Sequence, residues 1–303
     1  MSDANESSPE VTDLGSITAS VSSGVDRQVV SLMDLLSLRI DIEAEFCRKL
    51  HELEWSYENK IQEIRKKRSL IIRGAIKAVD LQSCKIAVVI DEKFDDDVSE
   101  VCDQSEIKNF WLTAMRNSKT LSRMIFSHDE PILSHLMDIT VHLTKDPMGF
   151  VLCFFFNQNP YFTNPVLKKE YFLKCAVNPD YPYEFQGPEV VGCKGCNIRW
   201  KKGKNVTVET VKRRGRKKRK GGYKHEKRSS FFKFFELNTL TKDVVFSREA
   251  KFALADFAIG QYFRNSFIPR AIQYYCAEVE DDSDDEILSV FDDSDDSDDS
   301  VTY

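Results

Sequence analysis

The sequence predicts an α+β protein in which a long dimerisation helix precedes an antiparallel sheet packed with helices and carrying a basic β-hairpin. Three observations lead to this fold class. No Pro or Gly occurs between Gly24 and Gly74, and apolar residues there recur at spacings of three and four, as on one side of a helix. Short apolar runs separated by Asn-Pro and Pro-Met-Gly turns follow, as in antiparallel strands. A later Lys- and Arg-rich segment begins with strict alternation of apolar and polar residues, which indicates an exposed hairpin.

The long helix is predicted within residues 26–90, after a Ser-, Asp- and Glu-rich segment, residues 1–25, that is expected to be disordered. A continuous helix of about 50 residues would be about 75 Å long, longer than any domain this chain can build. Its apolar stripe needs a partner, and a second copy of the chain is the simplest one. The alternative is a helix folded back on itself near Gly74. The predicted dimer interface consists of Leu36, Phe46, Leu50, Leu53, Tyr57, Ile61 and Ile64.

A polar linker at residues 91–106 leads into an α/β domain predicted for residues 107–277. The domain opens with helical spacing over residues 107–126, where Ser118 and Ser127 are expected to cap helices. Asn-Pro and Tyr-Pro pairs punctuate the connections that follow. Three apolar runs between them predict the strands of an antiparallel sheet, at residues 138–143, 150–156 and 169–175.

An accessory basic hairpin is predicted at residues 199–229. Residues 206–213 alternate apolar and polar side chains, and residues 224–229 can return antiparallel after a glycine-containing tip. Phe- and Tyr-rich amphipathic helices close the domain at residues 251–275. Residues 278–303 consist mainly of Asp and Ser. This tail is expected to be disordered because it lacks the apolar residues that would offset the entropy of folding.

The formal net charge of −6 combines two opposite blocks. Residues 278–303 contain 13 acidic residues and no Lys or Arg, whereas residues 199–228 contain 15 basic residues against two Glu. Such blocks are normally solvated interaction segments, so charged macromolecules are the expected partners. The longest apolar run is too short for a bilayer and no apolar leader is found, so we expect neither secretion nor a membrane span. The eight scattered Cys favour reduced thiols in cytosol or nucleus.

Five ordered motifs show that the sequence from about Asp41 to Ala277 resembles the nucleosome assembly protein family. They are Asn109-Phe110-Trp111-Leu112-Thr113-Ala114, Asn159-Pro160-Tyr161-Phe162-Thr163-Asn164, Trp200-Lys201-Lys202-Gly203-Lys204-Asn205-Val206-Thr207, Ser230-Phe231-Phe232-Lys233-Phe234-Phe235 and Ile268-Pro269-Arg270-Ala271. The last of these motifs, Ile268-Pro269-Arg270-Ala271, and the basic hairpin resemble the nucleosome-assembly branch of the family rather than the SET branch. The resemblance implies a homodimer that binds core histones, an import signal on the hairpin, an export signal in the dimer helix, and no catalysis.

The acidic tail is the predicted histone-binding element, because a flexible polyanion would compete with DNA for basic histone surfaces through fast, salt-sensitive contacts. Phe291 is expected to dock on an apolar histone patch. Ser283 and Ser289 are candidate phosphorylation sites, because each is followed three residues later by the acidic residue that acidophilic kinases recognise. The alternative is a solubilising tail without a partner. The predicted histone-binding residues are Asp281, Asp282, Asp284, Asp285, Glu286, Phe291, Asp292, Asp293, Asp295, Asp296, Asp298 and Asp299.

The hairpin tip fits a nuclear import signal, so importins are expected partners, and it fits direct DNA or RNA contact equally well. Pairing of the tip with the chain's own acidic tail is a further alternative. The predicted import signal consists of Arg213, Arg214, Arg216, Lys217, Lys218, Arg219 and Lys220. The predicted export signal consists of Leu32, Leu35, Leu38 and Ile40, although any amphipathic helix shows that spacing. Together these signals predict shuttling between nucleus and cytoplasm.

No catalytic constellation, cofactor motif or metal site is expected. Cys193 and Cys196 form a single pair without two further donors, and zinc sites need four ligands. One departure from the family concerns residues 235–257, where Glu236, Asp243, Glu249 and Asp256 are balanced by Lys and Arg. The folded domain is therefore expected to have a weak acidic lining that contributes little to histone binding. The predicted function is that of a histone chaperone, with a SET-type adaptor and a nucleic-acid-binding dimer as alternatives.

Overall fold

The computed structural model describes residues 24–75, 106–179, 181–212, 223–236 and 248–279, and it confirms the α+β fold class. The chain divides into two compact units, which are described separately. The first comprises Met1–Lys49 and Cys175–Pro188, and the second comprises Leu50–Lys174 and Glu189–Tyr303.

Helix α1 (Gly24–Ile72) is continuous over 49 residues, as the absence of Pro and Gly predicts. Its end follows from the glycine at the C-terminal boundary: Gly74 has a φ of 67°, which suits a residue without Cβ. The amide of Gly74 donates to Ile71 O at 3.0 Å and that of Ala75 to Leu70 O at 2.9 Å, the two bonds of a Schellman motif. The helix thus ends well before residue 90, and residues 76–105 lie outside the described part of the chain.

The first unit contains the N-terminal part of α1 and the segment Cys175–Pro188, which includes the short 3-10 helix η2 (Pro182–Glu184). Ile40 and Ala44 lie one turn apart on α1 and are buried with Phe185 in a small cluster. Cys47 and Val177 pack against this cluster. Nearby, the Arg48 guanidinium donates to the carbonyl of Cys175 at 2.8 Å. Apolar contacts and the Arg48 hydrogen bond therefore connect the described part of the segment to the helix.

The second unit is built on a four-stranded antiparallel sheet of order β1-β2-β3-β4. The three predicted strands are present, although the third begins three residues earlier than predicted and ends at Lys174. The fourth strand, β4, was not predicted. The strands are β1 (Leu136–Thr144), β2 (Gly149–Phe156), β3 (Val166–Lys174) and β4 (Glu189–Lys194).

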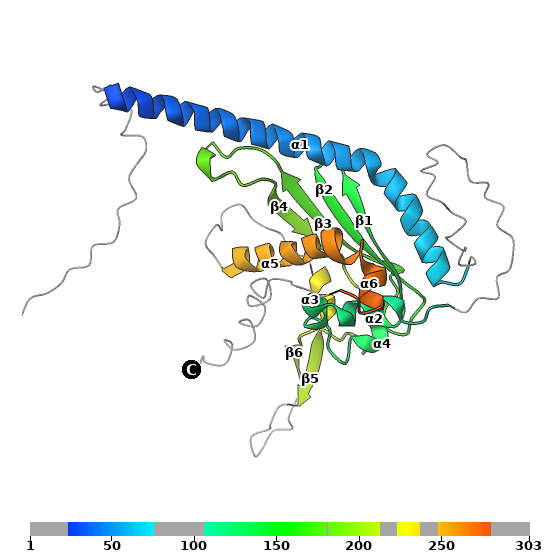
Figure 1. The fold of residues 1–303 in the computed structure, drawn as a ribbon. Coiled ribbons are helices and arrows are strands. Elements are labelled where there is room, and N and C mark those ends of the chain that lie inside the picture. Colours follow the sequence, from blue (N-terminus) through cyan, green and yellow to red (C-terminus); the bar gives the residue numbers. More distant parts are fainter. Residues whose placement is uncertain (1–23, 76–105, 180, 213–222, 237–247, 280–303) are drawn as a thin grey trace, which may run out of the picture. The chain divides into compact units, whose positions relative to one another are not determined.

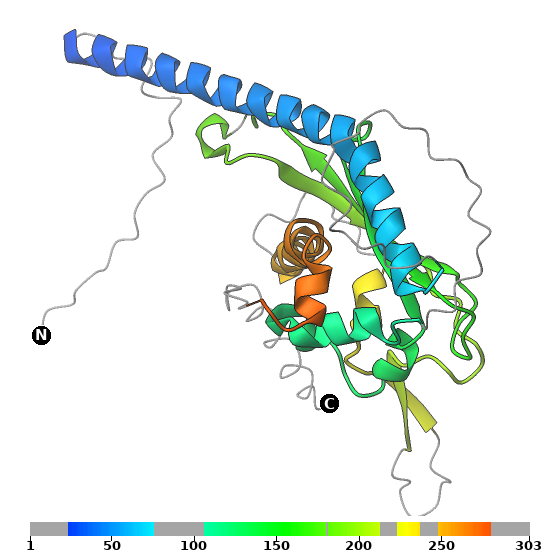
Figure 2. The same ribbon diagram turned by 45° about the vertical axis from the view of Figure 1, so that its right-hand side comes forward.

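Alternate residues of β2 point into the main core, as the period of a strand requires. Phe150, Leu152 and Phe154 are fully buried on this face. The η3 helix (Phe231–Phe235) and α5 (Arg248–Tyr262) supply the facing rings: Phe154 contacts Phe231, Phe234 and Phe235, and Phe150 contacts Phe257. Figures 1 and 2 show α5 lying across this face of the sheet. The π-helical turn Phe263–Phe267 and α6 (Ala271–Tyr275) complete the closing helices.

Short helices α2 (Phe110–Asn117), α3 (Lys119–Ser122) and α4 (Glu130–Leu133) precede the sheet. Ser118 caps α3 by accepting from Leu121 N at 3.3 Å, as predicted. The prediction for Ser127 was wrong: α4 begins only at Glu130, with Asp129 at its N-cap position and Pro in its first turn. Strands β5 (Val208–Lys212) and β6 (Tyr223–Lys227) form the predicted hairpin, which extends away from the sheet (Figure 1).

Candidate functional site

Most of the predicted binding residues lie outside the described part of the chain. These are the tail residues 280–303, including Phe291, Ser283 and Ser289, and the whole import cluster at 213–220. The structure describes α1, the base of the hairpin and the folded core. These regions decide which surfaces and charges the folded chain itself offers to a partner.

Helix α1 carries a row of exposed apolar side chains. All seven residues of the predicted dimer interface are exposed, from 37% for Leu36 to 70% for Ile64. Phe46 is 62% exposed and Tyr57 51%. Apolar side chains in this number at helical spacing are typical of a surface that a partner covers. The intramolecular contacts of the described residues do not cover this row.

The four residues of the predicted export signal do not share one environment. Leu32, Leu35 and Leu38 are between 56% and 64% exposed, whereas Ile40 is 5% exposed and packs with Ala44 and Phe185. Ile40 belongs to a second face of α1, which the segment Cys175–Pro188 covers. A receptor that needs all four side chains would require this segment to move.

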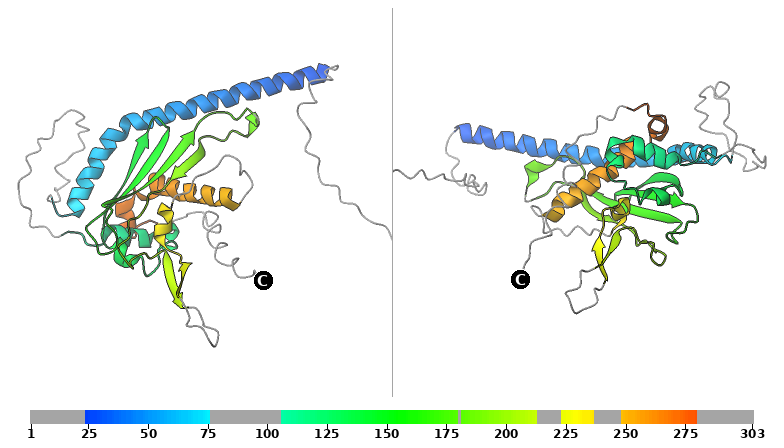
Figure 3. Two further views of the ribbon diagram at one scale, coloured as in Figure 1. Left: turned by 180° about the vertical axis from the view of Figure 1, so that it is seen from behind. Right: turned by 90° about the horizontal axis from the view of Figure 1, so that it is seen from below.

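In the second unit, polar side chains of α1 close the outer edge of β1. Gln62 Nε2 and Arg65 donate to the carbonyl of Val141 at 2.6 and 2.9 Å, and His51 Nε2 lies 2.7 Å from Thr144 O. Figure 3 shows this part of α1 running along the β1 side of the sheet. Unpaired strand edges are templates for pairing with other chains. The helix therefore occupies the β1 edge at Val141 and Thr144.

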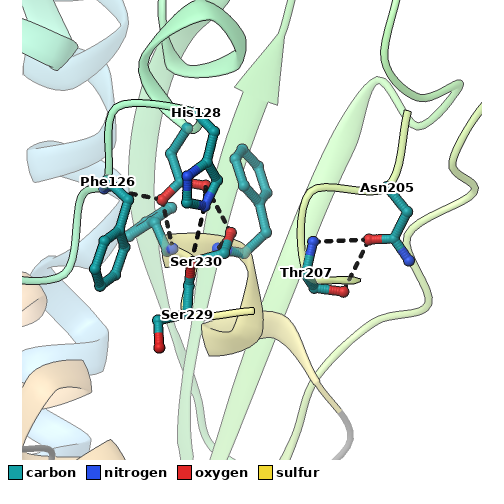
Figure 4. A network of polar contacts seen from close by, with 9 residues as sticks. Phe126, His128, Asn205, Thr207, Ser229 and Ser230 are labelled. Atoms are coloured by element: carbon teal, nitrogen blue, oxygen red, sulfur yellow. Dashed lines mark hydrogen bonds and ion pairs between the residues drawn. The ribbon is translucent and has the colours of Figure 1, made fainter. Parts of the chain in front are cut away.

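A network of polar contacts fixes the base of the hairpin (Figure 4). Asp129 is fully buried, and its carboxylate accepts hydrogen bonds from the hydroxyl of Ser230 at 2.6 Å and from the amide of Phe231 at 2.8 Å. The amide of Phe126 donates to the same carboxylate at 3.0 Å. His128 Nε2 lies 2.9 Å from Ser229 O. We call Phe126, His128, Asp129, Ser229, Ser230 and Phe231 the hairpin-base network.

A buried ion pair anchors α5 to β3. Lys169 is fully buried on the core face of the sheet, and its ammonium lies 3.0 Å from Asp256 Oδ1. Tyr171 OH donates to the carbonyl of Asp256 at 3.0 Å, and a Cβ at Gly260 would come within 2.5 Å of the Tyr171 ring. Burial raises the pKa of Asp256, while Lys169 acts in the opposite direction. We call Lys169, Tyr171, Asp256 and Gly260 the α5 anchor.

The buried position of Asp256 removes one acid from the possible acidic lining of the folded domain. Asp256 is one of the four acidic residues noted between 235 and 257, and its carboxylate is turned inward to Lys169 rather than outward to a ligand. Asp129 and Asp138 are buried as well. Between residues 106 and 279, the described part of the chain contains 22 Lys and Arg against 14 Asp and Glu. The described part of this domain is therefore net basic.

Cys193 and Cys196 lie on the sheet side of the second unit, Cys193 buried and Cys196 partly buried. Cys193 lies in β4, and burial raises its pKa to about 11. Among the described residues, no group of three or more His, Cys, Asp and Glu side chains is arranged to hold a metal ion. A search of the same residues for helices long and apolar enough to cross a membrane finds none.

Comparison with known proteins identifies extensive similarity. The family described as "Nucleosome assembly protein (NAP)" matches residues 27–278. Nucleosome assembly protein 1-like 4 of Mus musculus is 38% identical over 283 residues, which cover 86% of this chain and 75% of that protein. Nucleosome assembly protein 1-like 1 of Xenopus tropicalis is 37% identical over 281 residues, with 86% and 71% covered.

Solved structures give the same fold. Nucleosome Assembly Protein 1 from Plasmodium knowlesi matches with a TM-score of 0.55 at 23% identity, covering 86% of this chain and 100% of that one. The malaria parasite Nucleosome Assembly Protein matches with a TM-score of 0.53 at the same identity and coverage. These two likenesses support the architecture of a long helix followed by an antiparallel sheet.

Proposed function

The chain belongs to the nucleosome assembly protein family, and on this premise we propose that it is a histone chaperone that binds core histones and promotes nucleosome assembly. The observation that carries the proposal is the similarity of residues 27–278 to this family, with 38% identity to a nucleosome assembly protein over 283 residues. The separation of charge along the chain supports it, because histones are basic and need an acidic partner.

We further propose that the acidic tail provides most of the charge that faces the histones. Three carboxylates of the folded domain, Asp129, Asp138 and Asp256, are buried, and the described residues of that domain are net basic. The tail, in contrast, carries 13 acidic residues within residues 278–303. A polyanion shields Lys and Arg reversibly, so histones could be held away from DNA and then released to it.

The test is a titration of the full chain with core histone dimers and, separately, with duplex DNA at about 150 mM salt, where screening already limits surface attraction. Preferential histone binding and relief of histone–DNA aggregates are expected. A chain that ends at residue 279 should bind histones at least about tenfold more weakly, a loss of about 1.4 kcal/mol. Replacement of the 12 Asp and Glu in residues 280–303 by Asn and Gln serves as a matched control for length and should behave like the truncation.

Other outcomes distinguish the alternatives. Indifference to histones would favour a regulatory adaptor, and tighter binding of DNA than of histones would favour a nucleic-acid-binding protein. Full histone affinity without the tail would contradict the proposed role of the tail while leaving the chaperone function intact.

We propose that the exposed row on α1 forms a homodimer interface. The row extends from Leu36 to Ile64, and a second copy of the helix presents a matching surface. Sedimentation equilibrium should show a dimer, and the double substitution Leu53→Glu and Tyr57→Glu should shift it toward monomer. Asn59→Glu introduces charge on another side of the same helix and should leave the dimer intact. A dimer that survives the double substitution would refute this interface.

We also propose that the hairpin tip carries an import signal and that the chain shuttles between nucleus and cytoplasm. The hairpin-base network fixes the residues that follow β6, and β5 and β6 extend away from the sheet. Alanine at Arg213, Arg214, Arg216 and Lys217 should abolish nuclear accumulation of a tagged chain. Alanine at Lys201, Lys202 and Lys204 removes basic charge outside the tip and is the control. Equal loss with both variants would indicate a general effect of charge.

A further inference from the structure

Two cysteines lie where the segment Cys175–Pro188 covers the second face of α1, the face that contains Ile40. Cys47 lies on α1 and Cys175 follows β3, 128 positions later in the sequence, yet the Cys47 thiol is close enough to Cys175 to influence its pKa. Both belong to the first compact unit. The Arg48 guanidinium donates to the carbonyl of Cys175 at 2.8 Å, which holds the backbone of Cys175 beside the helix turn that carries Cys47.

The two thiols differ in access to solvent. Cys175 is 4% exposed, whereas Cys47 is of intermediate exposure at the margin of the cluster formed by Ile40, Ala44 and Phe185. An oxidant can therefore reach Cys47 first, and Cys175 is in place to react with it. We propose that Cys47 and Cys175 are an oxidant-sensitive modification site, which closes to an intramolecular disulfide and ties the segment Cys175–Pro188 to α1.

The oxidant is a small disulfide of the glutathione class. The thiolate of Cys47 attacks one sulfur of oxidised glutathione, so that a mixed disulfide forms and one glutathione thiolate leaves. The Cys175 thiol then loses its proton to solvent and its sulfur attacks Cys47 Sγ, releasing the second glutathione. The two protein thiols lose two electrons, and the glutathione disulfide gains them.

The raised pKa of Cys175 suits a thiol that reacts second, with the mixed disulfide already formed on Cys47. Burial, reinforced by the neighbouring Cys47, raises the pKa of Cys175 to about 11, so this thiol is almost entirely protonated at neutral pH and does not attack a dissolved oxidant first; its attack on Cys47 Sγ depends on the proximity of the two side chains. The pair is thus expected to remain reduced in a reducing compartment and to close only under oxidative load.

Closure would add a covalent link to the apolar contacts that the described part of the segment makes with α1. Phe185 and Val177 are its apolar contacts to the α1 cluster, while Tyr181 and Tyr183 are 61% and 40% exposed. Segments with so few buried contacts open locally at low cost in free energy. A covalent link from Cys175 to α1 would suppress this opening and keep Ile40 covered.

The experiment uses the full chain, incubated with oxidised glutathione, alkylated and digested under non-reducing conditions. Mass spectrometry should find one peptide pair joined through Cys47 and Cys175. Chymotryptic cleavage after Tyr183 should slow at least about tenfold, since cleavage needs local opening, and dithiothreitol should restore it. Cys47→Ser and Cys175→Ser should each abolish the link and the protection. Cys276→Ser, which removes an exposed thiol elsewhere, should retain both.

Three results would overturn the proposal. They are a glutathione adduct that persists on Cys47, a Cys47–Cys47 link between two copies, and linkage of either cysteine only to other cysteines of the chain. The wild-type digest alone distinguishes these outcomes, so the conclusion does not depend on correct folding of the serine variants. A Cys47–Cys175 link without protection at Tyr183 would overturn the structural consequence.

Discussion

Replacement of Lys169 by Met tests the α5 anchor. The ammonium of Lys169 lies 3.0 Å from Asp256 Oδ1, and both side chains are at least nine-tenths buried. Met occupies a similar volume but carries no charge, so Lys169→Met leaves the Asp256 carboxylate buried without its counter-ion. Removal of one partner from a buried pair typically costs about 3–5 kcal/mol. We expect a loss of that size in the free energy of unfolding at pH 7.

The loss can be measured by urea unfolding followed by tryptophan fluorescence, at a fixed protein concentration because dimerisation would add to the apparent stability. Lys168→Met is the matched control: its side chain is exposed, and we expect a change within about 0.5 kcal/mol. The double variant Lys169→Met with Asp256→Leu removes both charges and should recover most of the loss, since apolar replacements of buried pairs are often neutral. A single variant that loses under about 1 kcal/mol, or a double variant no better than the single one, would refute this account.

The pH dependence provides a second check. Burial raises the pKa of Asp256, and Lys169 lowers it, so Lys169→Met should raise that pKa further. A carboxyl group with a raised pKa in the folded state destabilises the fold while it is ionised. This penalty is present at pH values above the folded-state pKa and disappears as the pH falls below the unfolded value of about 3.9. The stability gap between wild type and Lys169→Met should therefore narrow on acidification.

Two further substitutions test the packing around the sheet and the hairpin. Gly260→Ala would place a Cβ 2.5 Å from the Tyr171 ring and should destabilise the fold by about 1–3 kcal/mol in urea unfolding, whereas Gly192→Ala, with its nearest contact at 3.5 Å, should cost less. Asp129→Ala should cost about 2–4 kcal/mol because it leaves buried amides unpaired, and it should speed hydrogen exchange in β5 and β6. Equal exchange rates in Asp129→Ala and wild type would show that the hairpin-base network does not hold the hairpin.

The elements with strong local signals were predictable. The Gly-free interval predicted a long helix, and α1 begins at Gly24 and ends two residues before Gly74, whereas the predicted helical region extends to residue 90. The apolar runs gave β1 and β2 within two residues. Strand β4 was missed because Glu189–Lys194 contains a glycine and only a short apolar pair, and its pairing with β3 comes from a distant part of the sequence. Tertiary contact, rather than local propensity, makes this segment a strand.

The residues of the candidate sites also differ in whether local sequence signals or distant contacts place them. The exposed stripe on α1 was predictable because helical periodicity alone places those residues together. The partners of Lys169 and Asp129 were not, because each lies about 90–100 positions away in the sequence and no local pattern marks it. A Lys at an inward position of β3, between Leu167 and Tyr171, was the one available signal that a buried acid must exist elsewhere.

Burial of carboxylates inside the fold changes how the acidic residues of such a chain should be counted. Formal charge treats every carboxylate as available to a ligand, yet Asp129 accepts hydrogen bonds at the start of η3, Asp138 is buried near Arg68, and Asp256 neutralises Lys169. Each of these carboxylates is paired inside the fold and cannot also meet a histone without leaving an unpaired donor or cation behind. The remaining described acids of the domain are outnumbered by its Lys and Arg. We therefore expect attraction to a basic partner to come mainly from acids elsewhere in the chain, and residues 278–303 alone contain 13 of them.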